Sequence, residues 1–155
     1  MNSASEIIAA LRDRNQTLAV AESVTGGGIA NAITAAEGAS HCFLGGVIAY
    51  SEASKIRDLE VSPKLISDYG VYSEEVARAM AFGAAKRFGS DWAIATTGVA
   101  GPGASKGVAA GSVWVAFFGP DRNEALYLEL PGERGSIRSG AVESALAAFA
   151  RILSA

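Results

Sequence analysis

The chain has 155 residues, half of them hydrophobic, and a formal net charge of −3, so we expect one ordered domain over residues 1–155 rather than a disordered chain. Its basic residues are scattered and form no stripe, which argues against nucleic acid as a partner. No apolar run reaches the ~18 residues that cross a bilayer, and residues 1–14 lack the apolar core of a signal peptide, so we expect a cytoplasmic protein without a membrane partner.

The first half of the chain alternates predicted helices and strands. Ser3 to Glu6 matches a capping box and predicts a helix over residues 5–14. Residues 17–21 are nearly all apolar, as in a strand buried on both faces. Further predicted elements are a helix ended by Gly38, a strand over residues 42–51, and short helices over residues 52–59 and 63–69.

The second half contains the clearest helix and a hairpin. Ser73 is the predicted cap of a helix that stops at Gly89, with acidic residues in its first turn and basic residues in its last. A buried strand over residues 92–97 and a glycine-rich loop over residues 98–111 follow. Residues 112–118 and 124–130 predict a β-hairpin around residues 119–123, and residues 136–153 predict the last helix.

This alternation predicts a layered α/β domain, and the hairpin requires a mixed sheet, of about five strands in all. Two unusual connections follow buried strands: the turn after Ala21 and the glycine-rich loop. If those strands are parallel, both connections face the same crevice at the carboxyl edge of the sheet, where α/β folds bind ligands.

The rare residues narrow the chemistry. The chain has one histidine and one cysteine, His41 and Cys42, too few for a zinc site built on those residue types. They are neighbours at the start of a predicted strand, so their side chains point to opposite faces. We therefore expect no metal, no cofactor and no serine or cysteine nucleophile that a histidine activates.

Ser23 lies at the end of the first predicted strand, and Gly26, Gly27 and Gly28 follow it. Glycines let a backbone approach a ligand closely. The next helix would aim its free N–H groups at the same point, which suits a phosphate or an oxyanion. The alternative is that Ser23 or Thr25 is an ordinary N-cap of that helix.

A serine nucleophile needs a base, and with histidine nearly excluded a lysine or a carboxylate remains. Lys55 follows Tyr50 by five residues, at the start of a short helix, so both could converge on one sheet edge. A lysine acts as a base only where burial or positive charge lowers its pKa. The alternative is that Lys55 and Tyr50 are solvated surface residues. Separately, Lys106 on the glycine-rich loop could contact a ligand.

Five stretches in chain order carry a family resemblance: "AESVTGG", "FLGGVIAYSEASKIRDL", "GVYSEEVARAMAFGAAKRFGSD", "TTGVAGPG" and "LPGERGSIRSGAV". They resemble the AES-C-TGG, GGVVAYSNEAKIRLL, G-x-x-SEEVA-x-AMA, TGIAGPGG and FPGDR-x3-R segments of the CinA carboxyl-terminal domain family. The match covers residues 18–146, almost the whole chain.

The resemblance implies a three-layer α/β/α domain that self-associates, with a dimer favoured. It also implies a nicotinamide-nucleotide amidase, which hydrolyses nicotinamide mononucleotide to nicotinate mononucleotide and ammonia. A small nucleotide is then the expected partner. Full-length relatives carry an extra amino-terminal domain, and this chain is expected to be the stand-alone form.

The family's serine–lysine mechanism makes Ser23 the implied nucleophile, Lys55 the base and Tyr50 an assisting hydroxyl. We therefore expect the Ser23 hydroxyl and the Lys55 amine within hydrogen-bond reach. The implied substrate contacts are backbone oxyanion donors at Thr25, Gly26 and Gly27, a nucleotide site at Thr97, Gly98 and Gly101, and phosphate ligands at Arg134 and Arg138.

Two departures from the family leave alternatives open. Val24 replaces the family's cysteine, and the glycine-rich loop is one residue shorter and lacks a Lys-Pro pair. The changed loop favours an amidase for another small pyridine or nucleotide amide. The third alternative is a catalytically silent binding or assembly domain linked to competence or DNA damage.

Overall fold

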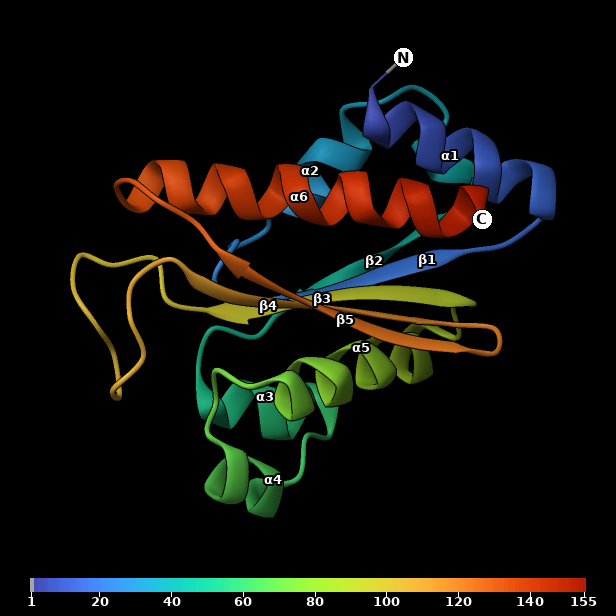
Figure 1. Ribbon diagram of the computed structural model, residues 1–155. Coiled ribbons are helices and arrows are strands. Elements are labelled where there is room, and N and C mark those ends of the chain that lie inside the picture. Colours follow the sequence, from blue (N-terminus) through green and yellow to red (C-terminus); the bar gives the residue numbers. More distant parts are fainter. Residues whose placement is uncertain (1) are drawn as a thin grey trace.

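The computed structural model describes residues 2–155, which build a five-stranded mixed sheet between two layers of helices (Figure 1). The strands are β1(Leu18–Glu22), β2(Phe43–Ile48), β3(Trp92–Gly98), β4(Ser112–Gly119) and β5(Arg122–Glu129), in the order β2-β1-β3-β4-β5. Strand β1 pairs in parallel with β2 and β3, while β3, β4 and β5 pair antiparallel. The predicted three-layer α/β/α fold with a mixed sheet is confirmed.

Helices lie on both faces of the sheet. One layer holds α1(Ser3–Arg14), α2(Gly28–Thr34) and α6(Arg134–Ser154). The opposite layer holds α3(Glu52–Leu59), α4(Pro63–Tyr69) and α5(Glu74–Phe88). A short 3-10 helix, Ala39–His41, precedes β2. Both faces of the central strands are therefore buried, which explains the nearly continuous apolar runs in the sequence.

Alternate residues of β1 join different cores. Leu18 and Val20 pack with the α1–α2–α6 layer, whereas Ala19 and Ala21 pack with the α5 layer. Side chains alternate across a strand, so Glu22 has the parity of Leu18 and Val20 and lies on the α2 side. The alanine face lets α5 approach the sheet closely, while the larger residues fill the opposite core.

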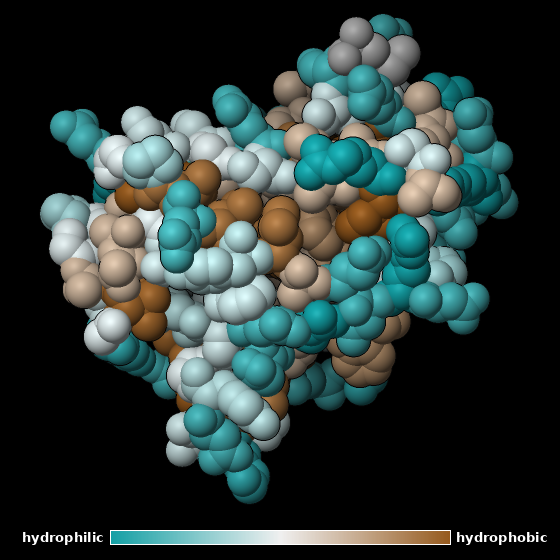
Figure 2. Space-filling model, in the orientation of Figure 1, coloured by the Kyte–Doolittle hydropathy of each residue, from teal (hydrophilic) through white to brown (hydrophobic). Residues whose placement is uncertain are grey.

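Figure 2 shows apolar residues gathered along the seam between α6 and the β5 edge of the sheet, with polar residues around them. Three leucines of this region are only partly buried and pack against the core beneath α6: Leu126, Leu128 and Leu130. The seam is thus a continuation of the core to the surface. No helix among residues 2–155 is long and apolar enough to span a membrane.

Two predicted helix ends differ from the structure. The predicted capping box at Ser3 is wrong, because the Asn2 side chain caps α1 and accepts the Ser5 N–H at 2.9 Å. Helix α2 ends at Thr34 rather than at Gly38. Gly38 instead has a φ of 87° and precedes the 3-10 helix, which turns the chain into β2.

The hairpin is tighter than predicted. Gly119 pairs with Arg122, so only Pro120 and Asp121 form the turn, and Asp121 adopts a φ of 57°. Proline followed by a residue with positive φ is the pattern of a type II turn. Strand β2 is shorter than predicted and ends at Ile48, three residues before the cap of α3 at Ser51.

Candidate active site

A cleft of about 410 Å³ lies where β1 and β3 end, within the size range of small-molecule sites. Its walls come from four parts of the chain: the turn after β1, the start of α3, residues 71–72, and the glycine-rich loop after β3, with Arg134 at the start of α6. Of the predicted site residues, six line it: Ser23, Tyr50, Lys55, Gly98, Gly101 and Arg134.

Ser23 and Lys55 meet at the bottom of this cleft. The Lys55 side chain is only 2% exposed. Its Nζ donates to Ser23 Oγ at 3.0 Å and to the Ala49 carbonyl at 2.9 Å. The predicted contact between the hydroxyl and the amine is confirmed, and it joins residues 32 positions apart.

The environment of Lys55 makes its amine a usable base. Burial lowers the pKa of Lys55 from 10.5 to about 8, with the Glu52 carboxylate opposing this shift and the Lys106 ammonium adding to it. With a pKa near 8, about a tenth of the amine is neutral at pH 7. A neutral amine beside Ser23 can accept the hydroxyl proton.

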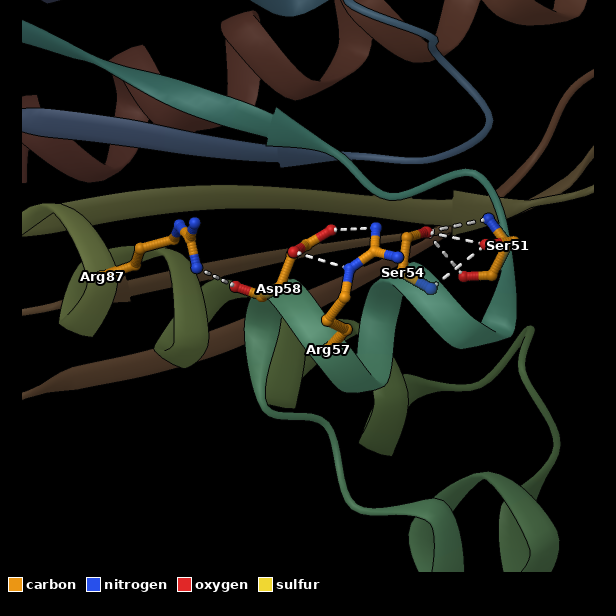
Figure 3. A network of polar contacts seen from close by, with 5 residues as sticks. All are labelled: Ser51, Ser54, Arg57, Asp58 and Arg87. Atoms are coloured by element: carbon orange, nitrogen blue, oxygen red, sulfur yellow. Dashed lines mark hydrogen bonds and ion pairs between the residues drawn. The ribbon is translucent and has the colours of Figure 1, made fainter.

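Helix α3, which carries Lys55, is anchored by the polar contacts drawn in Figure 3. Ser51 and Ser54 form a reciprocal capping box, with Ser51 Oγ accepting the Ser54 N–H at 3.1 Å and Ser54 Oγ accepting the Ser51 N–H at 3.1 Å. Arg87 on α5 donates to the carbonyl of Asp58 at 3.2 Å. The helix is thus fixed at its first turn and tied to α5 near its end, and Lys55 lies between these anchors.

The turn after Ser23 depends on glycine. Gly26 and Gly27 have φ angles of 58° and 100°, which L side chains rarely adopt. A Cβ on Gly26 would also lie 3.0 Å from Nη2 of Arg138. These two glycines reverse the chain between β1 and α2, and they do not line the cleft.

The expected free N–H groups at the start of α2 are not free, so that expectation was wrong. The N–H groups of Ile29 and Ala30 donate to the Glu22 carboxylate at 2.8 and 3.0 Å. The Gly26 N–H donates to the Ser23 carbonyl at 3.0 Å. An anion therefore cannot use these donors, because a buried side chain and the turn itself already bind them.

The N-cap alternative is wrong as well. Gly27, which has no side chain, occupies the N-cap position of α2, and the Glu22 carboxylate binds the first-turn N–H groups instead. Thr25 points away from the cleft and donates from Oγ1 to Glu22 Oε1 at 2.6 Å. Ser23 has its hydroxyl against Lys55.

Two further predicted substrate residues lie outside the cleft. Thr97 is fully buried and donates to the Val71 carbonyl at 2.9 Å. Arg138, one turn after Arg134 on α6, donates to the carbonyls of Val24 and Thr25 at 3.3 and 3.1 Å. These side chains hold the walls of the cleft rather than face a ligand.

Tyr50 and Arg134 form one rim of the cleft. Arg134 donates to the Tyr50 hydroxyl at 2.8 Å and to the Gly101 carbonyl at 2.6 Å. Tyr50 is 59% exposed, unlike Lys55 and Ser23. The arginine thereby links the segment before α3 to the glycine-rich loop.

The glycine-rich loop is tied down on the other rim. Ser105 shares a hydrogen bond of 2.9 Å with the Tyr72 hydroxyl, and Lys106 forms an ion pair with Glu52. The sequence indicates Lys106 as a possible ligand contact, but it does not indicate Glu52 or Tyr72. Neither has a local signal, since Glu52 resembles an ordinary first-turn acid. Within residues 2–155, no group of three or more His, Cys, Asp or Glu is placed to hold a metal ion.

Comparisons with known proteins agree with this architecture. The family model described as "CinA C-terminal domain" matches residues 1–153. A CinA-like protein from a Synechococcus strain is 54% identical over 76% of this chain and 28% of its own length. One from Frankia casuarinae is 40% identical over 95% of this chain and 34% of its own length. The chain thus spans about a third of the length of these curated relatives.

Solved structures match over nearly their whole length. A competence-damaged protein (CinA) superfamily protein from Escherichia coli has a TM-score of 0.94 at 32% identity, covering 97% of this chain and 88% of that chain. The competence damage-inducible protein A from Klebsiella pneumoniae has a TM-score of 0.95 at 31% identity, covering 99% and 98%.

Proposed function

Because the chain belongs to the CinA C-terminal domain family, we propose that it is an amidohydrolase that converts nicotinamide mononucleotide to nicotinate mononucleotide and ammonia. The observation that carries this proposal is the buried contact between Lys55 Nζ and Ser23 Oγ at 3.0 Å. Burying an ammonium group costs free energy. A buried lysine beside a serine hydroxyl that it can deprotonate is an arrangement typical of nucleophilic catalysis. The choice of nicotinamide mononucleotide rests on the motif resemblance.

In the first half of the reaction, neutral Lys55 takes the Ser23 proton as Oγ attacks the amide carbon. The carbonyl oxygen becomes an oxyanion. When the C–N bond breaks, the Lys55 ammonium returns the proton to the leaving nitrogen, which departs as ammonia. An ester between Ser23 and the pyridine carboxyl remains.

In the second half, a water molecule attacks this ester. Lys55 removes the water proton, the bond between the acyl carbon and Oγ breaks, and the proton returns to Ser23. The product leaves as a carboxylic acid that ionises in solution. Lys55 is the base in both attacks, so one group with a pKa near 8 serves the whole cycle.

The Val24 N–H is the oxyanion donor that we assign. Val24 lines the cleft directly after Ser23, and its N–H makes no hydrogen bond within residues 2–155. A free backbone N–H beside the nucleophile is the donor type that stabilises such an oxyanion. It replaces the donors expected at Thr25, Gly26 and Gly27. None of these residues lines the cleft, and the Gly26 N–H is already bonded to the Ser23 carbonyl.

Tyr50 and Arg134 would act at the substrate's polar end. A guanidinium can only donate, so Arg134 occupies a lone pair of the Tyr50 oxygen and leaves the phenolic proton for a substrate. The positive charge of Arg134 at an exposed rim suits the phosphate. Gly98 and Gly101 would flank the nucleotide.

A second candidate is an amidase for another small pyridine or nucleotide amide. The observation that favours it is the loop from Gly98 to Lys106, which forms a wall of the cleft and departs from the family's sequence. A changed wall changes which ligand shapes fit, while the Ser23–Lys55 pair stays the same.

The test is ammonia release from nicotinamide mononucleotide, with nicotinamide and other small amides assayed alongside. We expect the mononucleotide to be the best substrate and Ser23→Ala to be inactive. Turnover of another amide alone would favour the second candidate. Absence of turnover on every amide would reject the amidase proposal and leave the alternative of a binding or assembly domain.

A further inference from the structure

We propose that Glu22 is a positioning residue for the nucleophile: its buried carboxylate holds the turn that aims Ser23 at Lys55. This inference rests on the proposed role of Ser23. It also goes beyond that role, because Glu22 does not line the cleft and acts through other residues.

Glu22 is an unusual residue to bury. It is 0% exposed, and none of the ion pairs within residues 2–155 includes it. Its oxygens accept three hydrogen bonds, from Thr25 Oγ1 and from the N–H groups of Ile29 and Ala30. A charge in this setting costs free energy unless donors and a helix dipole compensate it. A serine or aspartate at the N-cap of α2 would bind the free N–H groups of the helix at a lower cost in free energy.

The carboxylate also orients a chain of hydroxyls that ends at the backbone N–H of Ser23. An ionised carboxylate only accepts, so the single Thr25 proton points to Glu22. The Thr96 proton must then point to Thr25, at an oxygen–oxygen distance of 2.8 Å. This leaves Thr96 Oγ1 free to accept the Ser23 N–H at 3.3 Å, beside the Thr96 carbonyl at 3.1 Å.

The turn is therefore held at both ends. Ser23 is fixed to β3 through Thr96, and the first turn of α2 is fixed to Glu22. Between them, Arg138 binds the carbonyls of Val24 and Thr25. A misplacement of about 1 Å in a reacting group can cost roughly a hundredfold in rate, so loosening the turn would lower kcat.

The test compares three variants with wild type. Glu22→Gln removes the charge and no longer fixes the direction of the hydrogen bonds between the hydroxyls. Thr25→Val breaks this series of hydrogen bonds without changing any charge. We expect kcat to fall by roughly a hundredfold in both and KM to change by less than about threefold, since neither side chain lines the cleft.

Thr17→Val is the matched control. Thr17 lies just before the opposite end of β1, and its hydroxyl bonds to Asp91 Oδ2 at 3.1 Å. The same substitution there is expected to lower Tm while kcat stays at the wild-type value. If Glu22→Gln does not fold, Thr25→Val carries the test, because it removes a single hydroxyl.

Two further readouts separate the outcomes. The rate at which a phosphonofluoridate labels Ser23 should fall in parallel with kcat, and the pH midpoint of turnover in Thr25→Val should match wild type. Wild-type kcat in both variants, with only Tm lowered, would show that Glu22 is a helix cap and overturn this inference alone. A wild-type protein that is neither labelled nor active would overturn the proposed function and this inference with it.

Discussion

At the scale of single residues, Lys55 sets the chemistry. It is among the large side chains that are fully buried within residues 2–155, and its amine contacts Ser23 Oγ and the Ala49 carbonyl. The motif resemblance predicted this contact by making Ser23 the nucleophile and Lys55 its base, whereas the order of strands and helices brought only Tyr50 and Lys55 to one sheet edge. The degree of burial, which lowers the pKa, has no local signal, since α3 has the composition of an exposed helix.

Ser23→Ala should remove nearly all turnover and leave the fold intact. The substitution deletes one hydroxyl and opens no core cavity, although Lys55 loses an acceptor at a cost of about 1 kcal/mol. Ammonia release and a melting curve on the same sample check this. Turnover near the wild-type level would reject Ser23 as the nucleophile.

Lys55→Met should abolish turnover and raise stability at pH 7. Methionine fills the same buried space without a charge, and a pKa lowered from 10.5 to about 8 corresponds to a stability cost on the order of 3 kcal/mol. Between pH 8 and 10.5 the unfolded chain binds a proton that the folded chain has released, so wild-type stability rises with pH in that window.

The free energy of unfolding that Lys55→Met gains over wild type should therefore shrink as the pH rises from 8 to 10.5. Urea unfolding at several pH values measures it. Equal destabilisation by the variant at every pH would show that the Lys55 amine contributes packing rather than a charge penalty.

At the scale of elements, the glycine-rich loop contributes a charge to the site. Lys106 lies on this loop and pairs with Glu52 in the first turn of α3. The Glu52 carboxylate raises the pKa of Lys55, and the Lys106 ammonium lowers it. The loop thus helps to set the pKa of Lys55, although none of its residues is near Lys55 in the sequence.

Turnover should rise with pH toward a plateau above about 8, since only neutral Lys55 can accept the Ser23 proton. Lys106→Ala should move this midpoint to higher pH, because it removes a positive charge and leaves Glu52 unpaired. A pH–rate profile of kcat/KM measures the shift.

Lys64→Ala serves as the control for Lys106→Ala. Lys64 is an exposed lysine on α4 that pairs with Asp68 at 2.6 Å, outside the cleft. Its removal should leave the midpoint unchanged. An unshifted midpoint in Lys106→Ala would show that solvent screens this charge from Lys55 completely.

At the scale of the whole molecule, the parallel pairing of β1 with β3 creates the site. Their carboxyl ends open at one edge, where α3 also begins (Figure 1). Helix α5 packs closely on the alanine face of the sheet, and α3 packs on α5, which places Lys55 under this edge. The cleft is a product of layer packing rather than of any one motif.

Turnover should survive EDTA. The proposed chemistry uses a hydroxyl, an amine and backbone donors, and the residues around the cleft offer no cluster of metal ligands within residues 2–155. An assay of ammonia release with and without chelator checks this. Loss of activity in EDTA and its return on adding a divalent metal would contradict the serine–lysine mechanism.

The sequence by itself determined the fold class and the order of the elements, and its motif resemblance to a known family supplied the Ser23–Lys55 pair. Apolar runs and caps are local patterns, and parallel strands with helical crossovers bring their carboxyl ends together whatever the details. Errors in the predicted elements lay at ends, as at Asn2 and Gly38, where competing caps differ little in free energy.

Only the tertiary structure decided which polar groups are free to meet a ligand. Glu22 takes the donors of α2, Arg138 takes the carbonyls of the turn, and Thr97 bonds to Val71. Each hydrogen bond other than that of Glu22 joins residues at least 26 positions apart. Local sequence patterns cannot show such partners, because a hydrogen-bonding group is claimed by whichever neighbour the packed layers bring to it.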